Sequence, residues 1–199
     1  LETERYTKDL LDRIVAVVGR SIENLAPATL EFNQGLAGFA VNRRRSRPNT
    51  RQFPGPVDQD VPVLAVRAPE GGLRAILFGY ACHATTMGGY DIDADYPGYA
   101  QTALEKMYPG AVALFVQGCG ADSNPLPRYH SFDQQLIDRS RELAALYGRV
   151  LASAVDLVLR AKMLPVAGPL RTVFEYADIP FEPRPSREEL ELRRKSADL

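Results

Sequence analysis

The stretch Leu73-Arg-Ala-Ile-Leu-Phe-Gly-Tyr-Ala81 decides the fold, because it is an apolar run of strand length. Pro97 suits the first turn of a helix over 98–107, and a second apolar run follows at 111–116. Strand, helix and strand over 73–116 predict a βαβ unit with a right-handed crossover. The expected fold class is therefore α/β, with a mixed β-sheet flanked by helices.

The two parallel strands of this unit should place two polar loops at one edge of the sheet. One loop follows the first strand at Cys82-His83, and the other follows the second strand at Gln117-Gly-Cys-Gly-Ala-Asp-Ser-Asn124. Because both strands end at the same edge, we expect these loops to emerge side by side. Ligands usually bind at the carboxyl ends of strands in open α/β sheets, so this edge is the predicted binding edge.

The part of the chain before this unit predicts a helix and two further strands. Thr7 can cap a helix that continues to about Asn24. Residues 28–41 predict an extended strand, in which Gly35 and Gly38 indicate a bulge or a bend.

A hairpin and a long loop are also predicted before the helix at 98–107. The run 61–68 and the run 73–81 are joined by Pro69-Glu-Gly-Gly72, which favours a hairpin. The strand predicted over 28–41 leads into Asn42 to Pro48, and from there to Pro62 the composition turns to Pro, Gly, Asp and Gln, which predicts a long loop.

The C-terminal part predicts a long amphipathic helix from about Phe132 to Met163, which should cover one face of the sheet. A further strand is predicted over 170–179. Ser186 and Glu189 form a capping box, so a last helix should begin near Arg187. The apolar stripe of the long helix consists of Leu143, Leu146, Tyr147, Val150, Leu151, Ala154, Val158 and Leu159.

Composition bounds the class of protein. The chain has 199 residues, a hydrophobic content of 45% and a formal net charge of −1, which fits one domain over 1–199. This charge gives no basic field for nucleic acid or an anionic membrane, so neither partner is expected. No apolar run approaches the roughly 18 residues of a membrane span, so no transmembrane segment is expected. The chain starts at Leu1 and stops within a helical pattern, which indicates an excerpt of a larger domain.

His83 is the histidine at the predicted binding edge. A neutral imidazole there could bind zinc or act as a general base, and Asp91, Asp93 or Asp95 could orient it or share a metal. The alternative is a structural or solvent-facing histidine, because a metal site needs three or more ligands. The second histidine, His130, is interpreted as an ordinary loop residue.

The second loop exposes Asp122, Ser123 and Asn124 after glycines that let the backbone approach a ligand closely. The alternative is a tight turn whose Asp and Asn side chains bond to their own backbone. The shared edge with the His83 loop favours a functional interpretation.

The cysteines and a basic run are open to two interpretations each. Cys82 and Cys119 could form a thiolate site or a disulfide, but small buried thiols at strand ends are commoner, and we favour that structural role. The run Arg43 to Arg47 is a solvated charge cluster by default. At a strand end, one of its arginines could instead reach a carboxylate, a phosphate or a developing oxyanion.

Four short motifs follow one another along the chain. They are Asn42-Arg43-Arg44, Cys-His83-Ala-Thr-Thr-Met87, Ala94-Asp-Tyr-Pro-Gly-Tyr-Ala100 and Phe115-Val-Gln-Gly-Cys-Gly-Ala-Asp-Ser-Asn-Pro125. In order and approximate spacing they resemble the neutral, non-lysosomal ceramidases. That family carries Asn-Arg-Ser, His-x-Thr-Ser-Met, Asp-Asn-Lys-Gly-Tyr-Ala-like and Gly-Asp-x-Ser-Pro-Asn-like motifs. The resemblance covers most of 7–121 and weakens beyond.

The resemblance implies a zinc-dependent amide hydrolase of sphingolipid metabolism. It makes His83 a zinc ligand, Arg43 a substrate or oxyanion contact, and Asp95 a substrate-binding residue. The serine of the last motif would attack the N-acyl amide of ceramide and release a fatty acid and sphingosine. The resemblance also favours a secreted or periplasmic protein and a small-molecule or lipid amide as its partner.

Two departures from the family pattern leave alternatives open. The family's other zinc ligands come from an upstream Thr-His-Thr-His segment and from downstream Glu and Tyr residues, all expected outside this chain. In the last motif, one register matches Ser123 with the family's serine. The other register preserves Asp122 and Pro125 but puts Asn124 in place of the serine, and an amide cannot accept an acyl group.

The leading expectation is a ceramidase-like zinc-dependent amide hydrolase with catalytic candidates Ser123, Asp122, Asn124 and Arg43. The alternative is a relative without the serine nucleophile. It would act through zinc-activated water on another substrate, or as a non-catalytic carbohydrate- or lipid-binding module. A cysteine hydrolase built on Cys82 or Cys119 is a third possibility.

Overall fold

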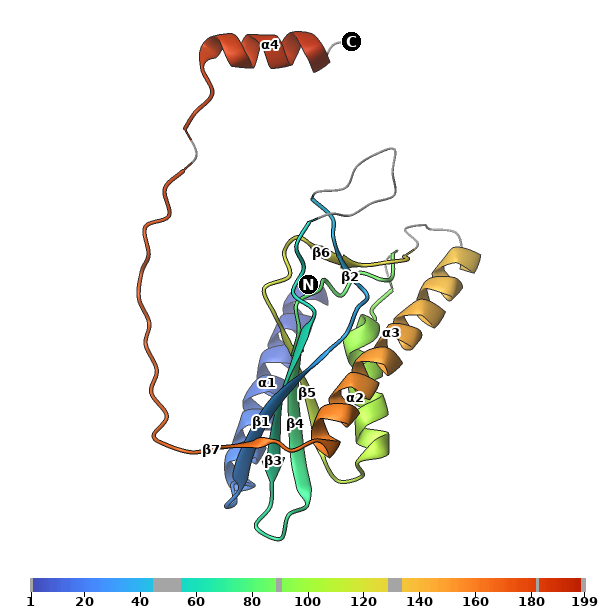
Figure 1. Ribbon diagram of the computed structural model, residues 1–199, viewed down its shortest axis with the longest axis vertical. Coiled ribbons are helices and arrows are strands. Elements are labelled where there is room, and N and C mark those ends of the chain that lie inside the picture. Colours follow the sequence, from blue (N-terminus) through green and yellow to red (C-terminus); the bar gives the residue numbers. More distant parts are fainter. Residues whose placement is uncertain (1, 45–54, 89–90, 129–133, 182, 198–199) are drawn as a thin grey trace. The chain divides into compact units, whose positions relative to one another are not determined.

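The structure is a computed structural model that describes residues 2–44, 55–88, 91–128, 134–181 and 183–197. Contacts divide the chain into two units, Leu1–Ala167 and Gly168–Leu199. The first unit contains the sheet and the predicted site (Figure 1). The His130 prediction, the start of the long helix at Phe132 and the basic residues beyond Arg44 fall outside the described residues.

A mixed five-stranded sheet, ordered β5-β4-β3-β1-β7, forms the centre of the first unit. It contains β1 (Thr29–Leu36), β3 (Asp60–Arg67), β4 (Leu73–Tyr80), β5 (Val112–Gln117) and β7 (Leu164–Val166). Strands β4 and β5 are parallel, with Tyr80 opposite Gln117, and the other neighbours are antiparallel. The α/β class and the βαβ unit over 73–116 are therefore confirmed.

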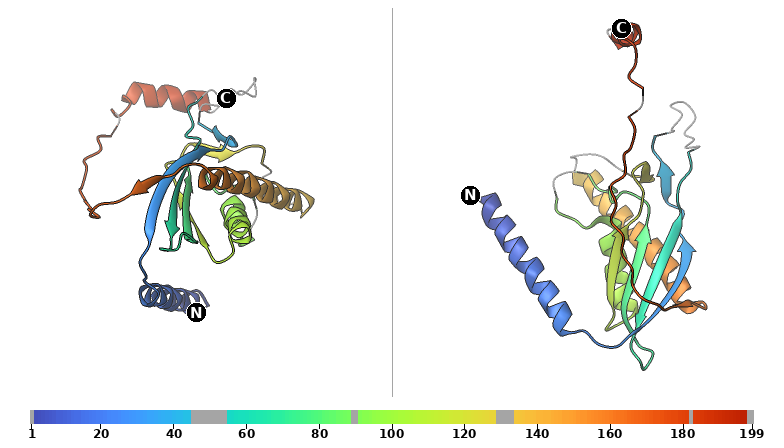
Figure 2. Two further views of the ribbon diagram at one scale, coloured as in Figure 1. Left: turned by 60° about the horizontal axis from the view of Figure 1, so that its bottom comes forward. Right: turned by 90° about the vertical axis from the view of Figure 1, so that its left-hand side faces the viewer.

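Two helices cover one face of this sheet, as the two views of Figure 2 make clear. They are α2 (Asp95–Met107), which crosses from β4 to β5, and α3 (Gln134–Arg160). Alternation along the strands buries one side of each, as at Val61, Val63 and Ala65 in β3. The apolar side chains of that face pack against Leu104 of α2 and Leu151 of α3 to form the core.

The opposite face of the sheet is apolar and partly exposed. Pairing in register places Leu30 beside Val66, Phe32 beside Leu64, and Leu77 beside Leu114 on this face. Val112, Leu114 and Val116 are all exposed there. A hollow of about 260 Å³ lies over it, lined in part by Phe32, Leu64 and Val116.

The N-terminal helix begins earlier than the sequence predicts. Helix α1 spans Glu2–Glu23, so the prediction that Thr7 caps it was wrong. The Thr7 hydroxyl instead donates to the carbonyl of Thr3 inside the helix, at 2.9 Å. A threonine one turn into a helix can make this bond, which is why a capping residue alone does not fix a boundary.

The strand predicted over 28–41 is interrupted. It ends at Leu36 as β1 and resumes as β2 (Ala40–Asn42), with the break beside Gly38. Strand β2 leaves the main sheet and pairs with β6 (Ser123–Pro125) in a separate two-stranded sheet. The predicted bend therefore transfers the chain from one sheet to another. This transfer places Asn42 and Arg43 beside the second predicted loop.

Other predicted boundaries and burial need correction. Helix α2 begins at Asp95 rather than near Gly98. In α3, most of the predicted stripe is buried, but Leu146 and Val150 are exposed because they lie at its margins.

In the second unit, the capping box before α4 (Arg187–Ala197) is confirmed. Ser186 N–H donates to Glu189 Oε2 at 2.8 Å, and Glu189 N–H donates to Ser186 Oγ at 3.2 Å. The strand predicted over 170–179 was wrong, because this segment has no regular structure. Its apolar residues have a strand pattern, but a strand also needs a neighbour to receive its backbone hydrogen bonds. No helix in the described ranges is both long and apolar enough to cross a membrane.

Candidate functional site

The parallel pairing of β4 and β5 brings the two predicted loops together at one edge. Gly118 N–H donates to the Tyr80 carbonyl at 3.0 Å, and His83 N–H donates to the Ser123 carbonyl at 3.0 Å. Gly120 has so little room that a Cβ there would lie 2.4 Å from the Ala81 carbonyl carbon. Glycine is required at this position because the two loop backbones touch. The predicted adjacency of the loops is confirmed.

The small sheet of β2 and β6 adds the Asn42-Arg43 segment to this edge. Asn42 pairs with Ser123 in an antiparallel register, and Arg43 N–H donates to the Asp122 carbonyl at 2.7 Å. Three stretches that are distant in sequence therefore meet. They carry Arg43, His83 and the run 122–124, which are the predicted site residues apart from Asp95.

A chain of side-chain hydrogen bonds runs through Asn42, Asp122 and Ser123. The Asn42 amide donates to Asp122 Oδ2 at 2.6 Å, and Ser123 Oγ donates to Asp122 Oδ1 at 3.3 Å. The same amide donates to the Pro56 carbonyl, so Asn42 is held from both sides. A hydroxyl, a carboxylate and a group that orients the carboxylate are the parts of an activated nucleophile. Ser123 itself is only 2% exposed.

His83 and Arg43 share one acceptor, the carbonyl oxygen of Ala121. His83 Nε2 lies 3.2 Å from it, and Arg43 Nη2 donates to it at 3.1 Å. Because a carbonyl oxygen only accepts, the contact places the histidine proton on Nε2. In the neutral ring, Nδ1 then carries the free lone pair, so this nitrogen could bind a metal or take a proton.

Asn124 faces a different set of partners. Its Oδ1 accepts a hydrogen bond from Thr85 Oγ1 at 3.4 Å, and Arg128 Nη1 donates to that same hydroxyl at 3.3 Å. The neighbouring Thr86 hydroxyl is buried and has no hydrogen-bond partner among the described residues. Asn124 thus connects β6 to the His83 loop and to Arg128.

Asp91, Asp93 and Asp95, the last of which is the first residue of α2, bond to groups other than His83. Asp95 is buried and accepts hydrogen bonds from Met87 N–H at 2.9 Å and from Tyr96 N–H at 2.7 Å. Asp93 accepts from Asp95 N–H at 2.6 Å. Asp95 also has a φ of 51°, a left-handed conformation that aspartate tolerates better than most residues. Its observed contacts fix the end of the His83 loop against the start of α2.

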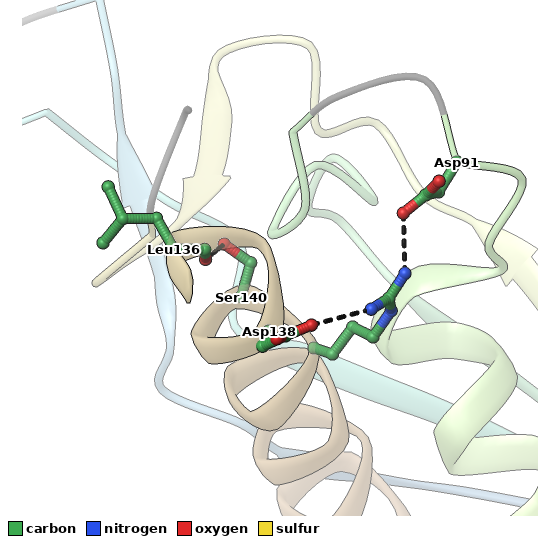
Figure 3. Close-up of polar contacts among 5 residues, drawn as sticks. Asp91, Leu136, Asp138 and Ser140 are labelled. Atoms are coloured by element: carbon green, nitrogen blue, oxygen red, sulfur yellow. Dashed lines mark hydrogen bonds and ion pairs between the residues drawn. The ribbon is translucent and has the colours of Figure 1, made fainter. Parts of the chain in front are cut away.

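Asp91 reaches α3 instead of the site. Figure 3 shows it joined to a guanidinium that also binds Asp138, and this group belongs to Arg141. The Asp91 contact is 2.6 Å long and the Asp138 contact is 3.0 Å. Both acids are about half exposed, so this network ties the loop to α3 at the surface.

A buried aromatic cluster supports the site from below. Phe39 lies 4.7 Å from Tyr80 and from Tyr147 between ring centroids, and 5.1 Å from Tyr96. Each tyrosine hydroxyl donates to a carbonyl of a different site segment. The acceptors are Ala37 for Tyr80, Cys82 for Tyr96 and Pro127 for Tyr147, at 2.6, 2.5 and 2.6 Å. Packing and hydrogen bonding together therefore fix the backbones that carry Arg43, His83 and Arg128.

The cysteines differ in environment. Cys82 is 0% exposed, and burial raises the pKa of its thiol to about 12, with the nearby charge of Asp95 acting in the same direction. A thiol in this state is a poor nucleophile, which argues against a cysteine hydrolase at Cys82. Cys119 is exposed, so the prediction of a buried thiol was wrong there. Both are free thiols, and the disulfide alternative is excluded in this structure.

The described residues do not by themselves fit a zinc site. Within those ranges, no cluster of three or more His, Cys, Asp and Glu side chains could hold a metal ion. His83 offers one imidazole whose neighbours are a backbone carbonyl and an arginine. A zinc ion bound at His83 would need its other ligands from elsewhere.

Three residues of the site were not predicted. Asn42 lies in a quoted motif directly after the strand predicted over 28–41, and that position was the available signal. Thr85 belongs to the His83 motif, but its contact with Asn124 spans 39 positions. Arg128 follows Leu126-Pro127 in a loop, and nothing in the neighbouring sequence marks it as a site residue.

Comparison with solved structures finds proteins that share the fold of this chain. A neutral ceramidase structure from Pseudomonas aeruginosa is 24% identical with a TM-score of 0.61, and the match covers 79% of this chain and 26% of that one. A structure described as ceramidase complexed with C2 is 21% identical with a TM-score of 0.59, covering 76% and 25%. The chain thus spans about a quarter of the length of these structures. Protein-family models and curated proteins gave no match.

The molecule is therefore an α/β protein with a loop cluster at the carboxyl ends of its parallel strands. Its fold is similar to that of neutral ceramidases, so the resemblance drawn from the four motifs is confirmed at the level of fold.

Proposed function

We propose that the chain is part of a ceramidase-like hydrolase of N-acyl amides, with its reaction centre at the cluster of Arg43, His83 and Asp122-Ser123. The observation that carries this proposal is the convergence of three of the four motif segments on one sheet edge, where the Asn42-Arg43 segment and the His83 segment each form hydrogen bonds with residues 121–123. The fold of the similar structures agrees with it. The substrate class is N-acylsphingosine or a related N-acyl amide.

The contacts support a role for each residue. Ser123 Oγ would attack the amide carbonyl carbon while its proton passes to Asp122, which Asn42 orients. Arg43 would stabilise the negative charge that develops on the carbonyl oxygen. The C–N bond then breaks, and the departing amine takes the proton from Asp122. Water hydrolyses the resulting ester and releases the carboxylic acid.

The zinc-dependent form of the proposal depends on His83. Bound zinc supplies a Lewis acid that polarises a carbonyl and lowers the pKa of a bound water. The described residues provide one ligand, so the steps above use only side chains of this chain. Zinc analysis of the purified protein and of His83→Ala tests the ligand role, since a variant that retains stoichiometric zinc removes it.

The burial of Ser123 favours a second candidate, a hydrolase in which water replaces the serine. In that case Asp122 would activate a water molecule, and Ser123 would serve only to orient the carboxylate.

One experiment separates the two. Hydrolysis of a fluorogenic N-acylsphingosine by the purified protein is measured for wild type, Ser123→Ala and Asp122→Asn. A nucleophilic serine predicts a fall of at least about a hundredfold in both variants. The water mechanism predicts that Ser123→Ala keeps most of the activity while Asp122→Asn does not. Absence of hydrolysis in the wild type would leave the binding-module alternative.

A further inference from the structure

We infer that Arg43 and Arg128 together form a binding site for an oxyanion, and that its natural occupant is the carboxylate of an aliphatic acid. This inference deepens the proposed function, on which it rests, because a carboxylic acid is the product of amide hydrolysis. It assigns a role to Arg128, which no motif marks.

The first observation is that two guanidinium groups are neighbours. Both groups reach the His83 loop: Arg43 Nη2 donates to the Ala121 carbonyl that His83 Nε2 also contacts, and Arg128 Nη1 donates to the hydroxyl of Thr85, two residues after His83. The pKa of Arg128 is lowered, chiefly by partial burial and next by the positive charge of Arg43. Arg128 is partly buried and Arg43 is exposed, so water screens the repulsion between them least at Arg128, where an anion beside the two groups would relieve it.

The second observation concerns the partners of these side chains. Arg43 donates to the Ala121 carbonyl, and Arg128 donates to the Thr85 hydroxyl, which are both neutral acceptors. Among the residues that the structure describes, neither guanidinium forms an ion pair with a carboxylate. The nearby carboxylate of Asp122 is engaged by Asn42 and Ser123.

The third observation is that each guanidinium has further N–H groups that could bind a ligand. A guanidinium has five N–H groups in a planar fork. The bonds to Ala121 and Thr85 use the Nε and Nη2 groups of Arg43 and the Nη1 group of Arg128. Forks of this kind match the two oxygens of a carboxylate or the oxygens of a phosphate. Arg43 is bonded to the carbonyl groups of Ala121 and Asp122, directly beside the proposed nucleophile Ser123. The carboxylate released by hydrolysis would form at this point, so it is the favoured occupant.

The test is calorimetric titration of the full chain with three probes. Octanoate carries the carboxylate, octanamide has the same chain length without the charge, and inorganic phosphate is the other oxyanion. We expect octanoate to bind at least about tenfold more tightly than octanamide, since bonds to an ionised group are the stronger ones. Arg128→Gln and Arg43→Gln should each weaken octanoate binding by about tenfold or more.

Controls separate charge from folding. Arg128→Lys keeps the charge and should retain part of the affinity that Arg128→Gln loses. Arg74→Gln removes an arginine that also donates to a carbonyl but lies at the other end of β4, and it should leave binding unchanged. The affinity of wild type for octanoate should fall as sodium chloride is added, a measurement that needs no variant.

Each outcome decides the inference. Tighter binding of phosphate than of octanoate, with the same dependence on both arginines, keeps the oxyanion site but makes phosphate its occupant. Equal binding of octanoate and octanamide, unchanged binding by Arg128→Gln, or no effect of salt overturns it. Failure of the proposed hydrolysis with intact octanoate binding would reject the reaction alone. Hydrolysis with no octanoate binding would reject this site alone.

Discussion

At the scale of single residues, tyrosine hydroxyls do more than fill the core. Tyr80 lies under the site, donates to the Ala37 carbonyl and accepts from Ala40 N–H at 3.1 Å. It thereby holds the turn that leads into β2 and so positions Asn42 and Arg43. Burial raises the pKa of Tyr80 to about 12. The hydroxyl therefore stays protonated in the folded protein at pH values where an exposed tyrosine ionises.

This difference predicts a loss of stability in alkali. Below pH 10, Tyr80 is protonated in both states, and its contribution is fully present. Between pH 10 and about 12 the unfolded state loses a proton that the folded state keeps, so the free energy of unfolding falls as pH rises. Denaturant unfolding measured from pH 7 to 12 should show a flatter decline for Tyr80→Phe than for wild type.

The same variant has a second signature. At pH 7, Tyr80→Phe should lower the free energy of unfolding by about 1–3 kcal/mol, because two buried backbone groups lose a partner. Tyr176→Phe is the control, since Tyr176 is 94% exposed and should change neither quantity. Parallel alkaline curves for Tyr80→Phe and wild type would contradict the prediction.

At the scale of elements, the contact between α2 and α3 depends on a missing side chain. Gly148 of α3 faces α2 so closely that a Cβ would lie 2.4 Å from the Tyr99 Cβ and 2.9 Å from the Tyr96 carbonyl oxygen. Tyr96 and Tyr147 both belong to the aromatic cluster under the site. The helix crossing and the site are therefore mechanically linked.

Replacement of glycine by alanine should have different effects on stability at positions 148 and 19. Gly148→Ala should destabilise the protein by about 1–3 kcal/mol, because the helices must separate. Gly19→Ala in α1, where nothing lies within 4 Å of the added Cβ, should be neutral or stabilise by up to about 1 kcal/mol through helix propensity. Thermal melting followed by circular dichroism measures both. An unchanged midpoint for Gly148→Ala would show that the crossing adjusts without strain.

At the scale of the whole molecule, the first unit has one sheet face packed against helices and one that is open to solvent in the described structure. Leu114 and Val116 on the open face are 46% and 49% exposed. Contiguous apolar surface of this kind binds apolar probes and promotes association.

The open face predicts strong binding of the dye anilinonaphthalene sulfonate to the folded chain. Replacing Leu114 and Val116 by threonine, a residue that strands favour, removes apolar surface from β5 and should lower the dye fluorescence. Leu157→Thr is the control, because Leu157 is also exposed but lies on α3. Equal losses in both variants would mean that the dye does not report on this face.

The sequence by itself determined the elements from 60 to 117 and the edge at which the site forms. Apolar runs of strand length, a glycine-containing hairpin turn and a proline near a helix start are local signals, so β3, β4, α2 and β5 follow from them. It also marked Arg43, His83 and Asp122-Ser123 through motifs. Their proposed chemical roles remain predictions.

Only the tertiary structure decided which of these residues meet and what they contact. The bond from Asn42 to Asp122 spans 80 positions, and Arg43 and Arg128 come together only because each contacts a segment that lies beside the His83 loop. It also tied Asp91 and Asp95 to neighbouring backbone and helix instead of to His83. Local patterns encode periodicity and turns, whereas these contacts depend on the path of the whole chain and on which partner buries each surface.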